Sequence, residues 1–182
     1  DEDGGGSLAR PFASIQFAVD RALPGDRIVI LPGLYFGETY LSHGGIAGTP
    51  ITIEARKFGE VVIDGMRKST SLFRLEKTPH VTIRNLEMRW YKGTGNGIYI
   101  VDSPGVTVSG CKVWNQLWRT GWPQGIGIFA HRSPGLTVER NLLIWQEHGM
   151  YLLKSPGARI FHNTATRNLY AALRMPFSAA NS

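Results

Sequence analysis

The stretch Ser103-Pro104-Gly105-Val106-Thr107-Val108 decides the fold, because close copies of it recur along this chain of 182 residues. The copies begin at residues 78, 103, 133 and 155, so successive copies lie 25, 30 and 22 residues apart. The other three read Thr78-Pro79-His80-Val81-Thr82-Ile83, Ser133-Pro134-Gly135-Leu136-Thr137-Val138 and Ser155-Pro156-Gly157-Ala158-Arg159-Ile160. Repetition at such a period indicates a stack of similar structural units.

Each copy joins two short runs in which apolar residues alternate with other residues, which is the pattern of β-strands. The apolar pairs before the turn are Phe73/Leu75, Ile98/Ile100, Ile126/Ile128 and Met150/Leu152, and those after it are Val81/Ile83, Val106/Val108, Leu136/Val138 and Ala158/Ile160. So short a unit leaves no room for the crossover helix of a βαβ unit. An antiparallel meander would carry two-residue hairpins such as Asn-Gly instead of one turn repeated in phase. The pattern predicts an all-β parallel β-helix whose inward side chains stack in columns.

The repeat also assigns side chains to columns. Asn141 and Asn163 share a bend position with Leu86 and Cys111, and we expect both amides to point inward and to hydrogen-bond along the stack. Cys111 is the one cysteine, so no intrachain disulfide forms, and it is expected to be a buried filler. The expected outward columns are Arg74, Tyr99, Gly127 and Tyr151 on the first strand, and Lys77, Asp102, Arg132 and Lys154 before the turn.

The N-terminal segment follows a different pattern. Apolar side chains at Ile15, Ala18, Val19 and Ala22 have helical spacing, which ends before Pro24-Gly25. An open end of a β-helix exposes core and unpaired backbone, so it needs a cap. We therefore predict a single domain over 1–182, with an N-terminal cap that contains a helix at 1–26 and coils at 27–182 that continue beyond the C-terminal end.

Motifs along the first third match those of a known group of proteins. They are Pro11-Phe12, Ile15-Gln16, Pro24-Gly25-Asp26, Pro32-Gly33, Pro50-Ile51-Thr52-Ile53 and Ile63-Asp64-Gly65. With the repeats, they resemble pectate-lyase-like right-handed parallel β-helix proteins over the whole chain. The resemblance implies a right-handed solenoid. It specifies chemistry less closely, because that superfamily includes polysaccharide lyases, glycoside hydrolases and uronate epimerases.

The charge balance indicates the class of partner. The chain has twenty Lys and Arg residues and fourteen Asp and Glu residues, which gives a net charge of +6. The basic residues are scattered singly along the sequence. A basic surface concentrates polyanions, but the absence of a basic block argues against nucleic acid. No apolar run is long enough to span a membrane. The basic charge is compatible with an acidic polymer, and the resemblance to pectate-lyase-like proteins implies a protein that handles polysaccharide outside the cytoplasm, in the medium, at the cell surface or in the periplasm.

Candidate catalytic residues come from a narrower resemblance. In the chondroitinase-B and alginate-lyase group, the pattern is a Lys-Ser in one coil, an Asn-Thr in the next strand and a Leu-Arg about one coil later. This chain has Lys154-Ser155, Asn163-Thr164 and Leu173-Arg174. β-Elimination needs a cation beside the uronate carboxylate and a base for the C5 proton. The resemblance implies that Lys154 is the base and that Arg174 is the assisting acid.

The sequence departs from that group in its metal site. The group holds calcium with acidic residues just before the lysine, whereas here 149–152 supply none and Glu147 alone cannot form a calcium cage. No set of calcium ligands is identified, so the metal remains unassigned. His131 and His148 are other acid–base candidates, and Glu147 beside His148 suggests an acid–base pair. Adjacent residues on a strand point to opposite faces, which argues against that pair. No aspartate pair typical of β-helix glycosidases is present, which disfavours hydrolysis.

Aromatic and basic side chains complete the expected site. Loop tryptophans can stack on sugar rings, and tyrosines of the outward column can line a groove. The predicted substrate-binding residues are Arg132, Tyr99, Tyr151, Trp118, Trp122 and His131. For Trp114 and Trp145, the sequence leaves core and surface positions open. The functional prediction is a secreted polysaccharide lyase, and the alternative is a non-catalytic extracellular β-helix that binds glycan or assembles laterally.

Overall fold

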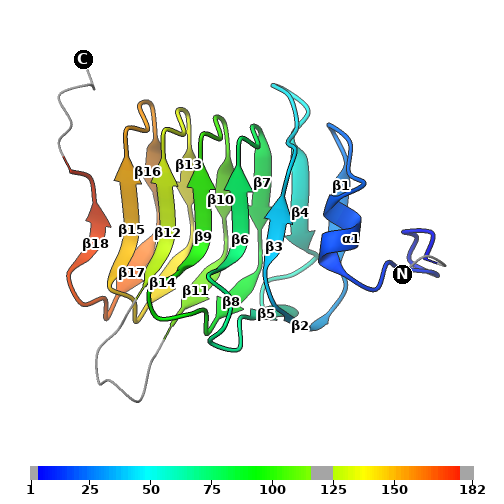
Figure 1. The fold of residues 1–182 in the computed structure, drawn as a ribbon, viewed down its shortest axis with the longest axis horizontal. Coiled ribbons are helices and arrows are strands. Elements are labelled where there is room, and N and C mark those ends of the chain that lie inside the picture. The colour runs from blue at the N-terminus through cyan, green and yellow to red at the C-terminus, as the bar shows by residue number, and fades with distance from the viewer. Residues whose placement is uncertain (1–3, 116–124, 177–182) are drawn as a thin grey trace.

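The strands coil about one axis and form three parallel sheets (Figure 1). The computed structural model describes residues 4–115 and 125–176. Every pairing between strands of neighbouring coils is parallel. The predicted parallel β-helix is therefore confirmed, and the antiparallel meander is excluded.

Each coil gives one strand to each sheet. Sheet A contains β1 (Arg27–Ile30), β4 (Ile51–Ala55), β7 (Val81–Arg84), β10 (Thr107–Ser109), β13 (Thr137–Glu139) and β16 (Arg159–Phe161). Sheet B contains β2 (Gly33–Phe36), β5 (Val61–Asp64), β8 (Glu87–Arg89), β11 (Lys112–Trp114), β14 (Leu142–Ile144) and β17 (Thr164–Thr166). Sheet C contains β3 (Thr39–Leu41), β6 (Ser71–Glu76), β9 (Asn96–Val101), β12 (Ile126–His131), β15 (His148–Leu153) and β18 (Ala171–Arg174).

A short helix lies at the N-terminal end of the solenoid, as predicted. Helix α1 spans Ile15–Val19, and the Ser14 hydroxyl caps it by accepting a hydrogen bond from the Phe17 backbone N–H at 3.1 Å. Ile15 and Val19 are buried, and the helix packs against β1 and β3. The apolar face of α1 thus covers the first coil (Figure 1).

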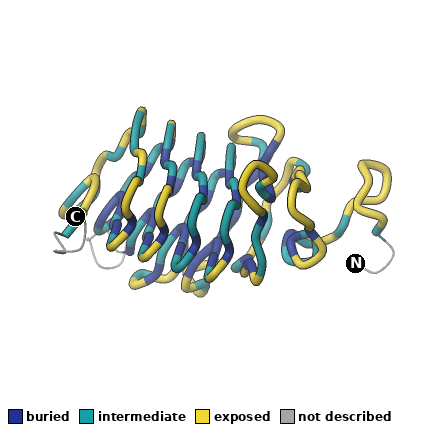
Figure 2. The backbone as a smooth tube through the Cα atoms, turned by 90° about the horizontal axis from the view of Figure 1, so that it is seen from above, coloured by how far each residue is buried: buried dark blue, intermediate teal, exposed yellow. Residues whose placement is uncertain are grey.

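The core is a continuous apolar column along the axis, with exposed residues concentrated at turns (Figure 2). Ile98 stacks between Phe73 and Ile128, and Ile100 between Leu75 and Ala130. The order of the apolar pairs predicts Ile98 against Ile126 and Ile100 against Ile128, and this alignment is wrong by two residues. Matching by size favoured isoleucine over the small Ala130, which is the true neighbour of Ile100. The outward position of that strand is consequently not Gly127 but Phe129, which is paired with Tyr99.

The asparagine column is confirmed. Asn141 accepts a hydrogen bond from the Cys111 backbone N–H at 2.9 Å and donates to the Val108 carbonyl at 3.0 Å. Its amide also donates to Asn163 Oδ1 at 3.0 Å. These bonds satisfy backbone groups that a bend would leave unpaired inside the solenoid. Cys111 is 1% exposed, and burial raises the pKa of its thiol to about 12.

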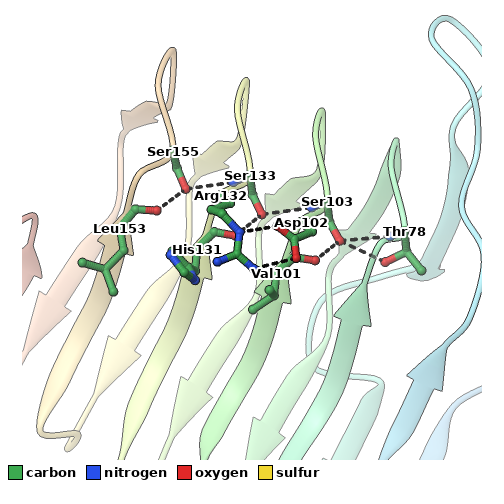
Figure 3. Close-up of polar contacts among 9 residues, drawn as sticks. All are labelled: Thr78, Val101, Asp102, Ser103, His131, Arg132, Ser133, Leu153 and Ser155. Carbon is green, nitrogen blue, oxygen red and sulfur yellow. Dashed lines mark hydrogen bonds and ion pairs between the residues drawn. The ribbon is translucent and has the colours of Figure 1, made fainter. Parts of the chain in front are cut away.

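The repeated Ser-Pro-Gly turns are joined by a serine ladder (Figure 3). Ser103 Oγ accepts from the Thr78 N–H at 3.0 Å, Ser133 Oγ from the Ser103 N–H at 3.2 Å, and Ser155 Oγ from the Ser133 N–H at 3.1 Å. Each of the three serine hydroxyls also donates a hydrogen bond to the backbone carbonyl two residues earlier in the same coil. The recurring serine therefore connects successive coils as well as starting each turn.

Candidate functional site on sheet C

The outer face of sheet C carries one continuous column of aromatic and basic side chains. In register along the solenoid these are Tyr40, Arg74, Tyr99, Phe129, Tyr151 and Arg174. The rings of Tyr99 and Phe129 are stacked, with centroids 5.3 Å apart and planes inclined by 10°. A basic group sits over each end of the ring row, because Arg74 lies 5.3 Å from the Tyr99 centroid and Arg174 lies 5.1 Å from that of Tyr151.

A cluster of titratable groups forms around His148, the first residue of β15. Its Nε2 lies 3.3 Å from Arg174 Nη1 and 3.9 Å from Glu147 Oε1. The imidazole centroid is 5.6 Å from the ring of Tyr151 and 5.6 Å from that of Tyr170. Strand β15 supplies His148 and Tyr151, and the following coil supplies Tyr170 and Arg174. Two successive coils therefore bring a cation, an imidazole and two phenols together.

The protonation state of His148 follows from its surroundings. Burial lowers its pKa, Glu147 opposes that shift and Arg174 adds to it. A guanidinium can only donate hydrogen bonds, so in this contact Nε2 accepts from Arg174 and the proton of the neutral ring sits on Nδ1. His148 is 3% exposed, and Nδ1 has no hydrogen-bond partner among the described residues. The imidazole is thus a neutral base whose lone pair is covered by Arg174.

The proximity of Glu147 and His148 corrects a prediction. Opposite orientations were expected for adjacent strand residues, but Glu147 precedes β15 and lies in a bend. The alternation of faces does not apply there, and the carboxylate reaches the ring. The contact of His148 with Arg174, across 26 residues of sequence, carried no sequence signal of its own; the shared register of β15 and β18 produces it.

Lys154 and Arg174, the pair expected to act together, occupy different parts of sheet C. Lys154 follows the last residue of β15 and is exposed, with a left-handed φ of 46°. The Arg174 guanidinium turns toward His148, which begins that strand. The two cations therefore belong to opposite ends of β15, and a shared role at one sugar stays a prediction.

At the turn edge of the sheet, Arg132 is already paired. Its Nε and Nη2 donate to the two carboxylate oxygens of Asp102 at 2.6 and 2.8 Å (Figure 3). Hydrogen bonding from Arg132 lowers the pKa of Asp102. The pKa of neighbouring His131 is lowered by burial and by the positive charges of Arg132 and Lys154, against an opposing effect of Asp102. The predicted substrate-binding residues Arg132 and His131 thus lie beside the aromatic column.

Two predicted substrate-binding residues, Trp118 and Trp122, lie outside the described residues. Trp114 and Trp145 are half-buried on the outside of sheet B, away from the core. Over the described ranges, no group of three or more His, Cys, Asp or Glu side chains is placed to hold a metal ion. Within the same ranges, no helix has the length and apolar character needed to cross a membrane.

Solved structures of polysaccharide-active enzymes share this architecture. An alginate lyase from Paenibacillus sp. str. FPU-7 superposes with a TM-score of 0.65 at 19% identity, over 91% of this chain and 56% of that one. Pectate lyase Pel9A gives a TM-score of 0.64 at 19% identity, over 90% and 52% of the two chains. A rhamnogalacturonan lyase gives 0.63 at 14% identity, over 100% and 62%.

These identities show a common fold and no more, and the chain spans only 52–62% of the length of the three enzymes. No curated protein matches the sequence. The family described as "Right handed beta helix region" matches residues 51–176, well over half of the chain. The repeated turns, the three parallel sheets and this match together show that the chain belongs to the right-handed β-helix family.

Proposed function

We propose that this protein is a polysaccharide lyase that cleaves an acidic polysaccharide by β-elimination on the outer face of sheet C. The observation that carries the proposal is the contact of Arg174 with the neutral imidazole of His148, 3.3 Å apart on an aromatic surface. Arg174 has no carboxylate partner within 4.0 Å among the described residues, so its charge is available to a ligand. The fold shared with alginate, pectate and rhamnogalacturonan lyases supports the same class of substrate.

Arg174 would neutralise the uronate carboxylate. A planar guanidinium binds a carboxylate through two parallel hydrogen bonds, and the neutralised carboxylate makes the C5 hydrogen of the sugar more acidic. A base then takes that proton, the C4–C5 double bond forms, and the C4–oxygen bond breaks. The departing oxygen takes a proton, so elimination consumes no water and needs no oxidant.

We assign the base to His148. In the free protein Arg174 covers its Nε2, so a guanidinium that turns to a bound carboxylate would uncover the lone pair beside the C5 proton. Because burial lowers the pKa of His148 below the ordinary histidine value, the ring is neutral and able to accept a proton at pH 7. Lys154, at the turn edge of the same coil, would add positive charge beside the bound polymer.

The aromatic column would hold the polymer. Tyr99, Phe129 and Tyr151 lie side by side across three successive coils, and their rings offer flat apolar surface to sugar rings. His131 and Arg132 lie along the turn edge of the same sheet. An extended polysaccharide would therefore lie along the solenoid axis. Such polymers occur outside the cytoplasm, so we expect the protein to act there.

The test is activity on alginate, polygalacturonate and other uronate polymers, followed by absorbance of the unsaturated product. His148→Gln is expected to lower kcat by about 100- to 10,000-fold, which is the usual contribution of a positioned base. Arg174→Gln should lower kcat similarly, because neutralisation of the carboxylate matters most in the transition state. Arg159→Gln, an exposed arginine on sheet A, is the matched control and should leave kcat unchanged.

The pH profile and Lys154 separate the roles. The decrease of kcat/KM toward acid pH should have its midpoint below pH 6.5, the ordinary pKa of histidine, and should be absent in His148→Gln. Lys154→Ala should raise KM with little change in kcat, and added salt should mimic it. A collapse of kcat in Lys154→Ala together with an active His148→Gln variant would instead make Lys154 the base.

A second candidate function is glycan binding without catalysis. The stacked rings of Tyr99 and Phe129 favour it, since such a surface binds sugars without any acid or base. If no uronate polymer yields unsaturated product while binding depends on Tyr99 and Phe129, this second function replaces the first.

A further inference from the structure

We propose a second saccharide site on the outer face of sheet B, which takes an acidic oligosaccharide and does not take part in cleavage. It rests on the proposed function only for the class of polymer. Sheet B follows sheet A in each coil and presents its own outer surface, separate from the column of sheet C. A polymer cleaved on one face could therefore be retained on another.

A row of three tryptophans forms the apolar part of this site. Trp90 and Trp114 have ring centroids 5.5 Å apart, and those of Trp114 and Trp145 are 6.4 Å apart, both in edge-to-face arrangements. Trp90 and Trp145 follow β8 and β14 with left-handed φ angles of 53° and 54°, and Trp114 ends β11. All three are half-buried, so each presents part of an indole surface outward.

A pocket of about 390 Å³ opens at one end of this row. It is lined by Lys112, Trp114, Ile144, Trp145, Thr166 and Arg167. Sites for small ligands have volumes of about 300–1,000 Å³ and combine apolar walls with a few placed polar groups. This pocket has that composition, because two indoles and an isoleucine form the apolar surface and two cations stand at its sides.

The charges of the lining favour an anionic ligand. Arg167 lies 5.2 Å from the Trp145 ring centroid and has no ion-pair partner within 4.0 Å in the described part of the chain. Lys112 is paired with Glu87 at 3.2 Å, and the Trp114 indole N–H donates to the same carboxylate at 2.9 Å. Glu87 therefore fixes Lys112 and Trp114, while Arg167 is left to bind a carboxylate.

A uronate residue meets both requirements. Its ring has an apolar face that can pack on Trp114 or Trp145, and its carboxylate can accept hydrogen bonds from Arg167. A neutral sugar would leave that cation unused. Two sites on one solenoid would also raise the effective concentration of a long polymer at the cleavage face.

The decisive variant adds a negative charge to the pocket without touching the core. Thr166 is exposed on β17 and lines the pocket. The probes are tetramers of galacturonate, mannuronate and guluronate, titrated by calorimetry into the full chain carrying His148→Gln, so that cleavage does not interfere. We expect two tetramers per chain, and one per chain when Thr166→Glu is added. Thr166→Gln should retain two, and Thr137→Glu, with the same change of net charge on sheet A, should retain two.

Two further comparisons sharpen the test. The fully methyl-esterified galacturonate tetramer, which keeps the rings but loses the charges, should lose at least tenfold in affinity at this site. Arg167→Gln should likewise bind one tetramer per chain instead of two. The melting temperatures of all variants should equal that of the His148→Gln chain. Retention of two tetramers by Thr166→Glu, or an equal affinity for the methyl ester, would overturn the inference.

The outcomes also separate the two proposals. In chains that retain His148, Thr166→Glu should leave the rate on short substrates unchanged and reduce it on long polymer. If the unmodified chain cleaves no uronate polymer but Thr166→Glu still loses one tetramer, the cleavage proposal fails and the second site stands.

Discussion

At three neighbouring positions of sheet C the interior admits no side chain. Gly97, Gly127 and Gly149 are buried one coil above the other. A Cβ on Gly127 would lie 2.4 Å from Gln146 Oε1 and 2.5 Å from the Gly149 carbonyl oxygen. Each of these glycines precedes an inward apolar residue and an outward aromatic one, so the glycine column marks the register of the three strands.

Gly127→Ala should therefore destabilise the protein by about 1–3 kcal/mol, the usual cost of overpacking. Gly33→Ala on β2 is the matched control, since its new methyl group would meet its nearest neighbour at 3.5 Å, an ordinary contact. Denaturant unfolding of both variants checks this. Equal stability of the two would mean that the interior of sheet C can relax around a methyl group.

The same residues explain where sequence reasoning fell short. Among the strands of sheets A and C for which apolar pairs were named, the pairs identified the inward face of all but β12, where isoleucines were matched by size and the glycine column was not used. The repeated Gly-Ile-Tyr, Gly-Ile-Phe and Gly-Met-Tyr triplets were the signal that could have placed Phe129 outward. The Arg174–His148 contact had no such signal, because it depends on how two side chains turn after the strands are aligned.

Among the elements, the turns and bends connect the coils through two polar ladders. The asparagine ladder was predictable, since two asparagines recur at one bend. The serine ladder was visible as a repeat but was interpreted only as a turn. Both place a polar side chain where the backbone leaves a sheet and would otherwise lack partners.

Ser133→Ala removes the acceptor for the buried Ser103 N–H and should cost about 1–3 kcal/mol, because an unsatisfied buried donor remains. Ser133→Thr should be nearly neutral, since Thr78 occupies the same column at the first repeated turn. Ser109→Ala, on the outer face of sheet A, is the control and should have little effect. Thermal unfolding of the three variants measures the difference, and a neutral Ser133→Ala would show that another group satisfies the Ser103 N–H.

In the whole molecule, the apolar core runs uninterrupted through the coils. Local unfolding of this core can therefore be measured by the reactivity of a single buried thiol. Cys111 is buried in a central coil, and burial raises its pKa to about 12. Few thiolates form at pH 8, and the sulfur is inaccessible in the folded state. Labelling by an aromatic disulfide reagent should be slowed by about a thousandfold or more relative to the unfolded chain.

The expected result is one reactive thiol per chain in denaturant and almost none without it, consistent with the single cysteine. Ser133→Ala, in the neighbouring coil, should label faster than Ser109→Ala. Rapid labelling of the unmodified protein in native buffer would contradict a continuous core.

The left-handed backbone positions before each turn have a consequence for how such a surface can change. Lys77, Asp102, Arg132 and Lys154 all adopt φ angles between 46° and 57°, where glycine would avoid a cost of about 1–2 kcal/mol. The strain is imposed by the coil, and aspartate suffers it less than lysine or arginine because its short side chain is tolerated in the left-handed region. Lysine and arginine are therefore exchangeable there at nearly constant backbone strain, whereas a change at Arg132 or Asp102 also removes the ion pair between them. Evolution can therefore change the charge along that edge at one coil at a time, while the backbone of the solenoid stays the same.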